Sequence, residues 1–162
     1  MTIDPASLES NLAKSLTAWI RAKLVTIEGL TVHIEDEPET SRPNEWVDVD
    51  YILDTRSQFG RHVSRTQQGG LTHGIVNLNL CKKRQSLTNI FALSVMADKA
   101  KAYFKTGQTI PINDYGLMGN PEVGRFLCYG ITQTDVDDGR GSGVIVRNLS
   151  VNINYTEAYT LV

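Results

Sequence analysis

Apolar residues recur at spacings of three and four near the start of the chain, which predicts an amphipathic helix. Asp4 can cap this helix, and Pro5 can occupy its first position, where a missing N–H costs no hydrogen bond. The apolar stripe consists of Leu8, Leu12, Leu16, Trp19, Ile20 and Leu24. Gly29 follows the stripe and predicts the end of the helical region.

The same spacing returns between residues 85 and 107 and predicts a second amphipathic helix. Thr88 or Asn89 can cap its start, and Gly107 is suited to its end. Its apolar positions are Ile90, Leu93, Ala97, Ala100 and Phe104.

Alternation of apolar and polar residues predicts strands in most of the remaining chain. The predicted strands are 31–34, 46–54, 74–80, 109–113, 126–136 and a last one from 144. Val146 and Leu149 differ in parity, so we expect a bulge or bend near Arg147. Two helices and these strands predict an α+β fold in one domain over 1–162. We expect a mainly antiparallel sheet with both helices on one face.

One strand candidate has an unusual second face. In GIVNLNL the side chains of Val76, Leu78 and Leu80 would point one way, and those of Asn77 and Asn79 the other. The closing segment NLSVNINY repeats the pattern with Asn148, Asn152 and Asn154. An amide-lined face is neither a hydrophobic core nor an ordinary charged surface. We therefore interpret it as a contact between subunits or as the lining of a wet channel.

Residues 54–70 lack a periodic pattern, and we expect either a long loop or a β-hairpin arm there. Basic side chains gather in this arm and after the 74–80 strand. They are Arg56, Arg61, Arg65, Lys82, Lys83 and Arg84. We regard them as candidate contacts with a subunit or partner, through carboxylates or phosphates, with a solubilising surface as the alternative.

Composition and charge restrict the classes of function. The 162 residues are 41% apolar and 21% charged, as in an ordinary globular protein. The net charge of −2 gives no global basic field that would recruit nucleic acid. No apolar run approaches the roughly 20 residues of a membrane helix, so we expect no membrane contact. We expect Cys81 and Cys128 to be reduced and buried, with a disulfide as the alternative.

Candidate chemistry is sparse. The three histidines, His33, His62 and His73, have no metal-ligand spacing with each other or with the cysteines. Asp48 and Asp50 share a strand face, which we interpret as solvated. No nucleophile is paired with a base, so we expect no enzymatic activity and no cofactor or metal.

The central segment GGLTHGIVNLNLCKKRQSLTNIFALSVMADKAKAYFKTGQTIPI resembles the tail terminator proteins of long-tailed bacteriophages, also called tail completion or minor tail proteins. This family includes the lambda tail terminator. The matching parts are a glycine-preceded strand (Gly74 to Leu80), a helix end with Ala97-Asp98-Lys99 and Phe104, and the stretch from Gly107 to Ile112. The first helix and the closing strand also fit, whereas the lengths of 35–45 and 55–70 depart from the family.

The resemblance implies a structural virion protein with a fold related to tail-tube subunits. Such a protein assembles in the host cytoplasm as a homo-oligomeric, hexameric ring that caps the head-proximal end of the tail tube. The ring ends tube polymerisation and forms the docking surface for head-completion or connector proteins, with DNA passing through its lumen. The implied partners are the tail tube protein, the head-completion protein and, as a further candidate, the tape measure protein. The alternatives are a head–tail connector or neck ring protein, and a small nucleic-acid- or ligand-binding domain that uses the arm.

Overall fold

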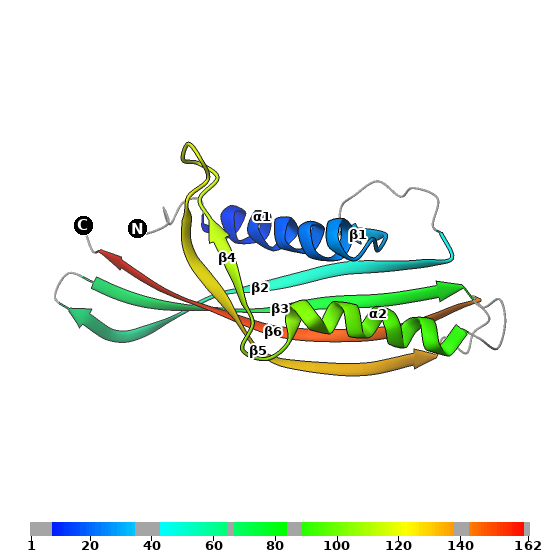
Figure 1. The fold of residues 1–162 in the computed structure, drawn as a ribbon. Coiled ribbons are helices and arrows are strands. Elements are labelled where there is room, and N and C mark those ends of the chain that lie inside the picture. The colour runs from blue at the N-terminus through cyan, green and yellow to red at the C-terminus, as the bar shows by residue number, and fades with distance from the viewer. Residues whose placement is uncertain (1–7, 35–42, 65–66, 84–88, 138–142, 161–162) are drawn as a thin grey trace.

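The computed structural model describes residues 8–34, 43–64, 67–83, 89–137 and 143–160. It contains one six-stranded sheet and two long helices (Figure 1). In chain order the elements are α1 (Leu8–Ile20), the π-helix η1 (Arg21–Ile27), β1 (Val32–Ile34), β2 (Glu45–Ser64), β3 (Gln67–Lys83), α2 (Asn89–Phe104), β4 (Thr109–Asn113), β5 (Glu122–Asp137) and β6 (Val144–Thr160).

The strands lie in the order β1-β2-β3-β6-β5-β4. Four neighbouring pairs are antiparallel, whereas β1 runs parallel to β2. The α+β class is therefore confirmed, and the sheet is mixed. The last strand, β6, lies in the interior of the sheet between β3 and β5.

Helix α1 continues directly into η1, and buried residues of the predicted stripe lie along both. Leu12, Leu16 and Leu24 are inaccessible to solvent or nearly so. Gly29 ends the region with φ of +68°, and its N–H donates to the Val25 carbonyl at 3.0 Å. A positive φ favours glycine, so the predicted end at Gly29 is confirmed. The predicted capping residues Asp4 and Pro5 lie outside the described residues.

Helix α2 buries its predicted face against the sheet. Its buried side chains include Leu93, Ala97, Ala100 and Phe104. Gly107 follows with φ of +87°, and its N–H donates to the Cys128 carbonyl on β5 at 2.8 Å. The glycine therefore both stops the helix and joins it to the sheet.

The core lies between the two helices and one face of the sheet. The strands contribute alternate residues, among them Val47, Val49, Val76, Leu78, Leu80, Leu149, Val151 and Ile153. Gly74 sits where β2 and β6 approach β3 closely. An added Cβ there would lie 2.9 Å from Leu53 Cδ2 and 3.0 Å from Ile153 Cγ1. Glycine at this position permits the close packing of three strands.

The bulge predicted near Arg147 is wrong. β6 pairs with β3 without a shift from Val144 to Thr160. Arg147 lies on the helix side, where it donates to Asp135 Oδ1 at 2.7 Å and to Ser94 Oγ on α2 at 3.1 Å. The strand itself is regular. The apolar residues change parity along it because Arg147, a polar residue, occupies a position that faces the helices and is bonded there to polar partners. The irregularity lies instead in β5, between Cys128 and Gly130, and β5 bends so that its hairpin with β4 rises from the sheet (Figure 1).

The arm is a strand extension. β2 and β3 remain paired beyond Asp54, with register shifts between Asp54 and Ser57 and again up to Ser64. β6 follows β3 along the same stretch, pairing Gln67 with Thr160. The hairpin alternative is therefore the one the structure adopts, with β6 as a third strand.

Candidate functional site

The sheet face turned away from the helices carries all the predicted amides. Strand register forms two rows across β2, β3 and β6, one of Asp48, Asn79 and Asn148 and the next of Asp50, Asn77 and Ser150. Asn152 and Asn154 continue the face along β6, opposite Ile75 and His73. We name this surface the amide face. It consists of Asp48, Asp50, Asn77, Asn79, Asn148, Ser150, Asn152 and Asn154, all of them half-buried.

Asn77 lies at the centre of a hydrogen-bonded chain on this face. Its Nδ2 donates to Asp50 Oδ1 at 2.7 Å, and its Oδ1 accepts from Ser150 Oγ at 2.7 Å. The Ser150 hydroxyl also lies 3.0 Å from Asn148 Oδ1, so its single proton has two acceptors available. Asn148 Nδ2 in turn donates to Asn79 Oδ1 at 2.7 Å. These contacts tie three neighbouring strands together by their side chains.

The network leaves hydrogen-bonding capacity on the surface. A primary amide has two N–H donors. Asn77 and Asn148 each use one of them in the contacts above, within the part of the chain that the structure describes. The second N–H of each can therefore meet a partner or solvent.

Apolar side chains flank the amide rows. At one end Trp46 and Cys81 are cross-strand partners and are both buried. Trp46 Nε1 donates to Asp48 Oδ2 at 3.0 Å, which joins this end to the network. At the other end Ile52 and Ile75 are cross-strand partners and are both exposed. The face is thus banded, with polar rows between two apolar ones.

Asp48 and Asp50 lie half-buried on the face turned away from the helices, which agrees with a face that solvent reaches, and they also accept hydrogen bonds from Trp46 and Asn77. The signal in the sequence for this shared face was side-chain parity. Both alternate with Val47 and Val49, which are buried, so both share a face with Asn77 and Asn79 once β2 and β3 are paired.

Lys82 and Lys83 lie at one end of β3, away from the part of β2 that carries Arg56 and Arg61. Lys82 donates to Glu45 Oε1 at 2.7 Å, across the β2–β3 pair, and Lys83 follows at the end of β3 opposite Val144. Arg56 and Arg61 lie on β2 in the arm, beside the opposite end of β3. Arg65 and Arg84 lie outside the described residues. A role in partner contacts stays a prediction for all six.

The cysteines lie on opposite faces of the sheet. Both are free and buried, as predicted. Cys128 belongs to the helix-covered core, and this burial raises the pKa of its thiol to about 11. A thiol with so high a pKa is a poor nucleophile at neutral pH. Cys81 lies on the other face, 3.8 Å from Asp48 Oδ2.

Within the described ranges, no three His, Cys, Asp or Glu side chains are grouped as metal ligands would be. None of the helices in these ranges has the length and apolar character needed to cross a membrane. The amide face offers hydrogen-bonding groups, and Ile52 and Ile75 beside it offer exposed apolar contact.

Comparisons with known proteins bear on the fold. No family model and no curated protein matches the chain. Fourteen chains of solved structures do match. One of them, which carries no functional description, superposes with a TM-score of 0.55 at 11% sequence identity and covers 94% of this chain and 95% of its own. This similarity shows that a solved protein of comparable extent shares the fold.

Proposed function

We propose that this chain is a phage tail terminator, a structural virion protein that caps the head-proximal end of a tail tube as a hexameric ring. In this role it ends tube polymerisation and offers a docking surface to the head or neck proteins. The amide face is the observation that carries the proposal. A fold related to tail-tube subunits belongs to the same proposal.

The chemistry of the amide face suits a ring subunit. Its exposed apolar band, formed by Ile52 and Ile75, can be buried against a protein neighbour, and its amides can satisfy polar groups there. Where the face meets water instead, amides do not bind phosphates by releasing counterions, as lysine and arginine do. DNA could therefore pass such a surface without being held.

The charge distribution favours this role over the nucleic-acid-binding alternative. Lys82 is paired with Glu45, and the arm arginines on β2 lie beside the far end of β3. Nucleic-acid-binding surfaces usually concentrate basic side chains on one face. The second candidate is a neck or connector ring, which the same amide face would suit.

Native mass spectrometry of the protein, alone and with purified tail tubes, tests the proposal. We expect a hexameric ring on the tube ends and tubes of fixed length. Symmetric density on the tube end would also locate the amide face within the ring. A chain that stays monomeric and leaves tube growth unchanged would overturn the proposal, and binding to the neck alone would favour the second candidate.

A double variant on the amide face tests whether this face takes part in assembly. Asn152 and Asn154 lie on the amide face, and each can be replaced by aspartate. Burying the new charges in a subunit contact is unfavourable, so N152D/N154D should fold but fail to assemble. Thr106→Asp, in the exposed turn after α2, adds a charge elsewhere and should assemble normally. Equal assembly of both variants would show that the face is not an interface.

A further inference from the structure

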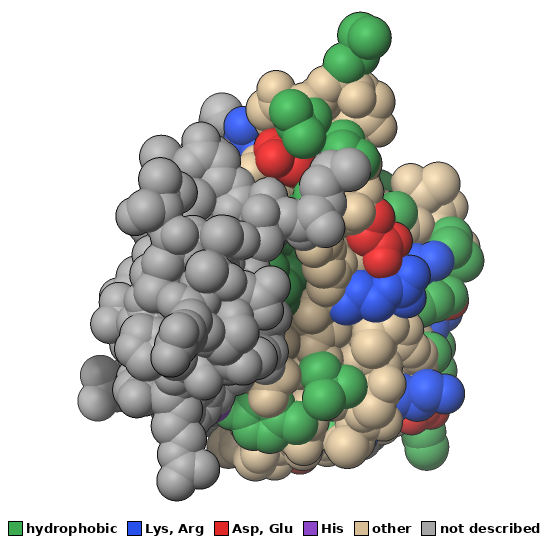
Figure 2. All heavy atoms as spheres, turned by 90° about the vertical axis from the view of Figure 1, so that its left-hand side faces the viewer, with side chains coloured by type: hydrophobic (Ala, Val, Ile, Leu, Met, Phe, Trp, Pro, Cys, Tyr) green, Lys and Arg blue, Asp and Glu red, His purple; other side chains and the backbone are tan. Residues whose placement is uncertain are grey.

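The turn of the β4–β5 hairpin displays apolar side chains to solvent. Met118 is fully exposed and Leu117 is 48% exposed. Figure 2 shows hydrophobic side chains at the top of the molecule, where this hairpin projects. Neighbouring exposed apolar side chains on a projecting turn are typical of contact sites between proteins.

The turn is firmly built. Asp114 is buried, and its Oδ1 accepts from Asn11 Nδ2 on α1 at 3.2 Å and from the Gly116 N–H at 2.9 Å. The Oδ1 of Asn11, which is also buried, accepts from the Tyr115 N–H at 3.1 Å. The Asn11 side chain on α1 thus holds the Asp114 side chain and the backbone directly after it.

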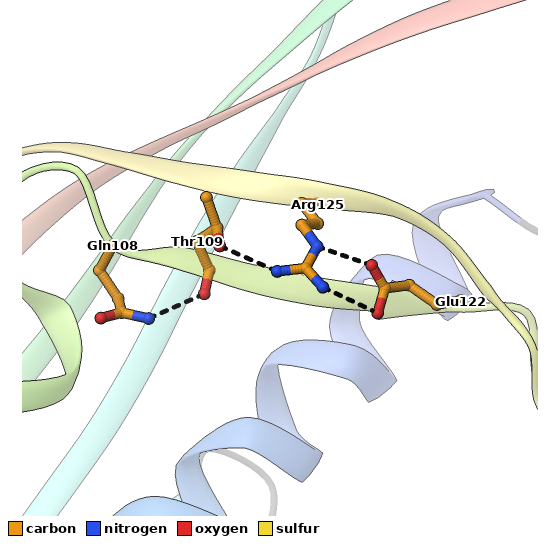
Figure 3. A network of polar contacts seen from close by, with 4 residues as sticks. All are labelled: Gln108, Thr109, Glu122 and Arg125. Atoms are coloured by element: carbon orange, nitrogen blue, oxygen red, sulfur yellow. Dashed lines mark hydrogen bonds and ion pairs between the residues drawn. The ribbon is translucent and has the colours of Figure 1, made fainter.

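Further contacts fix the rest of the turn. The Asn120 N–H donates to the Leu117 carbonyl at 3.1 Å, and Asn113 Nδ2 donates to the Asn120 carbonyl at 2.7 Å. On the hairpin below, Arg125 donates two hydrogen bonds to the Glu122 carboxylate and one to Thr109 Oγ1 (Figure 3). A turn held in this way loses little conformational freedom when a partner binds it.

A second apolar patch lies on α2. Phe91 is 78% exposed and Val95 is 54% exposed, and they are neighbours one helical turn apart. They point away from the core that Leu93 and Ala97 fill. Exposed Asp98 continues the same side of the helix. Aromatic side chains and methionine are both enriched in protein interfaces, and they make favourable contacts with each other.

The two patches cannot meet within one copy. The turn is fastened to α1, whereas α2 packs on β3 and β6 away from it (Figure 1). Charges of opposite sign lie beside the two sites. Lys14 Nζ lies 5.9 Å from the Tyr115 ring at the base of the turn, and Asp98 lies beside the α2 patch. The chain therefore carries both halves of a contact.

We propose that Leu117 and Met118 of one copy dock on Phe91 and Val95 of a second copy. The contact joins two different surfaces, so it is heterologous, and repetition closes a ring or extends a filament. It deepens the proposed function, on which its place in a terminator ring rests. The contact itself is a property of the chain in solution.

Cross-linking between two single-cysteine additions tests the contact. M118C and V95C proteins are mixed in concentrated solution with a short bismaleimide, and Cys81 and Cys128 stay unreactive because both are buried. We expect a cross-linked dimer from the mixture, none from wild type, and none when A18C, on the exposed side of α1, replaces M118C. Absence of the M118C–V95C product, or cross-linking of M118C to itself, would overturn the proposal.

Sedimentation of side-chain variants gives an independent measurement. L117S/M118S should weaken self-association about tenfold with an unchanged circular dichroism spectrum. Ile27→Ser is the matched control, because Ile27 is 58% exposed on η1. Equal effects of the two variants would contradict the assignment.

The test of this contact and the test of the proposed function can fail independently of each other. Cross-linking without binding to tail tubes leaves the contact standing and removes the terminator role. Tube capping without the cross-link leaves the terminator role standing and removes the contact.

Discussion

The two faces of the sheet are formed by the same strands and differ in almost every other respect. On β3, Leu78 is fully buried under the helices, while Asn77 and Asn79 on either side of it lie half-buried in a hydrogen-bonded network. Packed apolar side chains form the first face, and hydrogen-bonded amides form the second. Alternate residues of one strand can thus serve the fold and an interaction surface separately.

The largest expected effect comes from the core side of β3. Leu78→Ala should lower the free energy of unfolding by about 2–5 kcal/mol, because it removes buried methyl groups and leaves a cavity. Asn79→Ala, its neighbour on the amide face, should cost about 1 kcal/mol. Urea denaturation of both variants measures the difference. Equal losses would mean that the two faces contribute alike to stability.

The two cysteines allow the pH dependence of stability to be compared between the two faces of the sheet. Burial raises the pKa of Cys128 from 9.0 to about 11, so the unfolded chain ionises first as pH rises. Its contribution to stability is therefore complete below pH 9 and is lost towards pH 11, by roughly 2 kcal/mol. Removing the thiol in C128S should flatten the fall in stability over this range. C81S keeps Cys128 and should retain the fall, and an identical profile for both variants would contradict the assignment.

The amide network itself can be tested at Asn77. Asn77→Ala removes the partner of both Asp50 and Ser150 and should destabilise the fold by about 1–2 kcal/mol. A double-mutant cycle with Ser150→Ala should give a coupling of at least about 0.5 kcal/mol. Additive losses would show that the two side chains act independently.

The smallest expected effect is at the edge of the amide rows. The Lys82–Glu45 pair is 2.7 Å long, with Lys82 largely covered and the Glu45 side chain 43% exposed. Solvent screening limits such a pair, so a double-mutant cycle should give about 0.2–1 kcal/mol, decreasing with added salt. A larger coupling that persists at high salt would mean that this pair behaves as a buried one.

Sequence periodicity predicted much of this structure for a simple reason. Side-chain parity reports which face a residue occupies, so the core positions of β3 and the common face of Asn79 and Asn148 could be anticipated. Parity does not report which strand lies alongside. The interior place of β6, and the polar contacts of Arg147 on the helix side, depend on pairing between distant segments. The exposure of Met118 likewise follows from tertiary contacts of a turn.

The interior position of β6 has a consequence for how the chain folds. Its register joins Lys83 to Val144 and Gln67 to Thr160, so the sheet is closed by contacts far apart in sequence. Such contacts slow folding, because large loops must close before any pairing rewards them. During synthesis one edge of β3 stays unpaired until β6 has emerged from the ribosome. The core is complete only after β6 has paired with β3. Premature pairing of that unpaired edge with another nascent chain is an aggregation hazard that this topology creates.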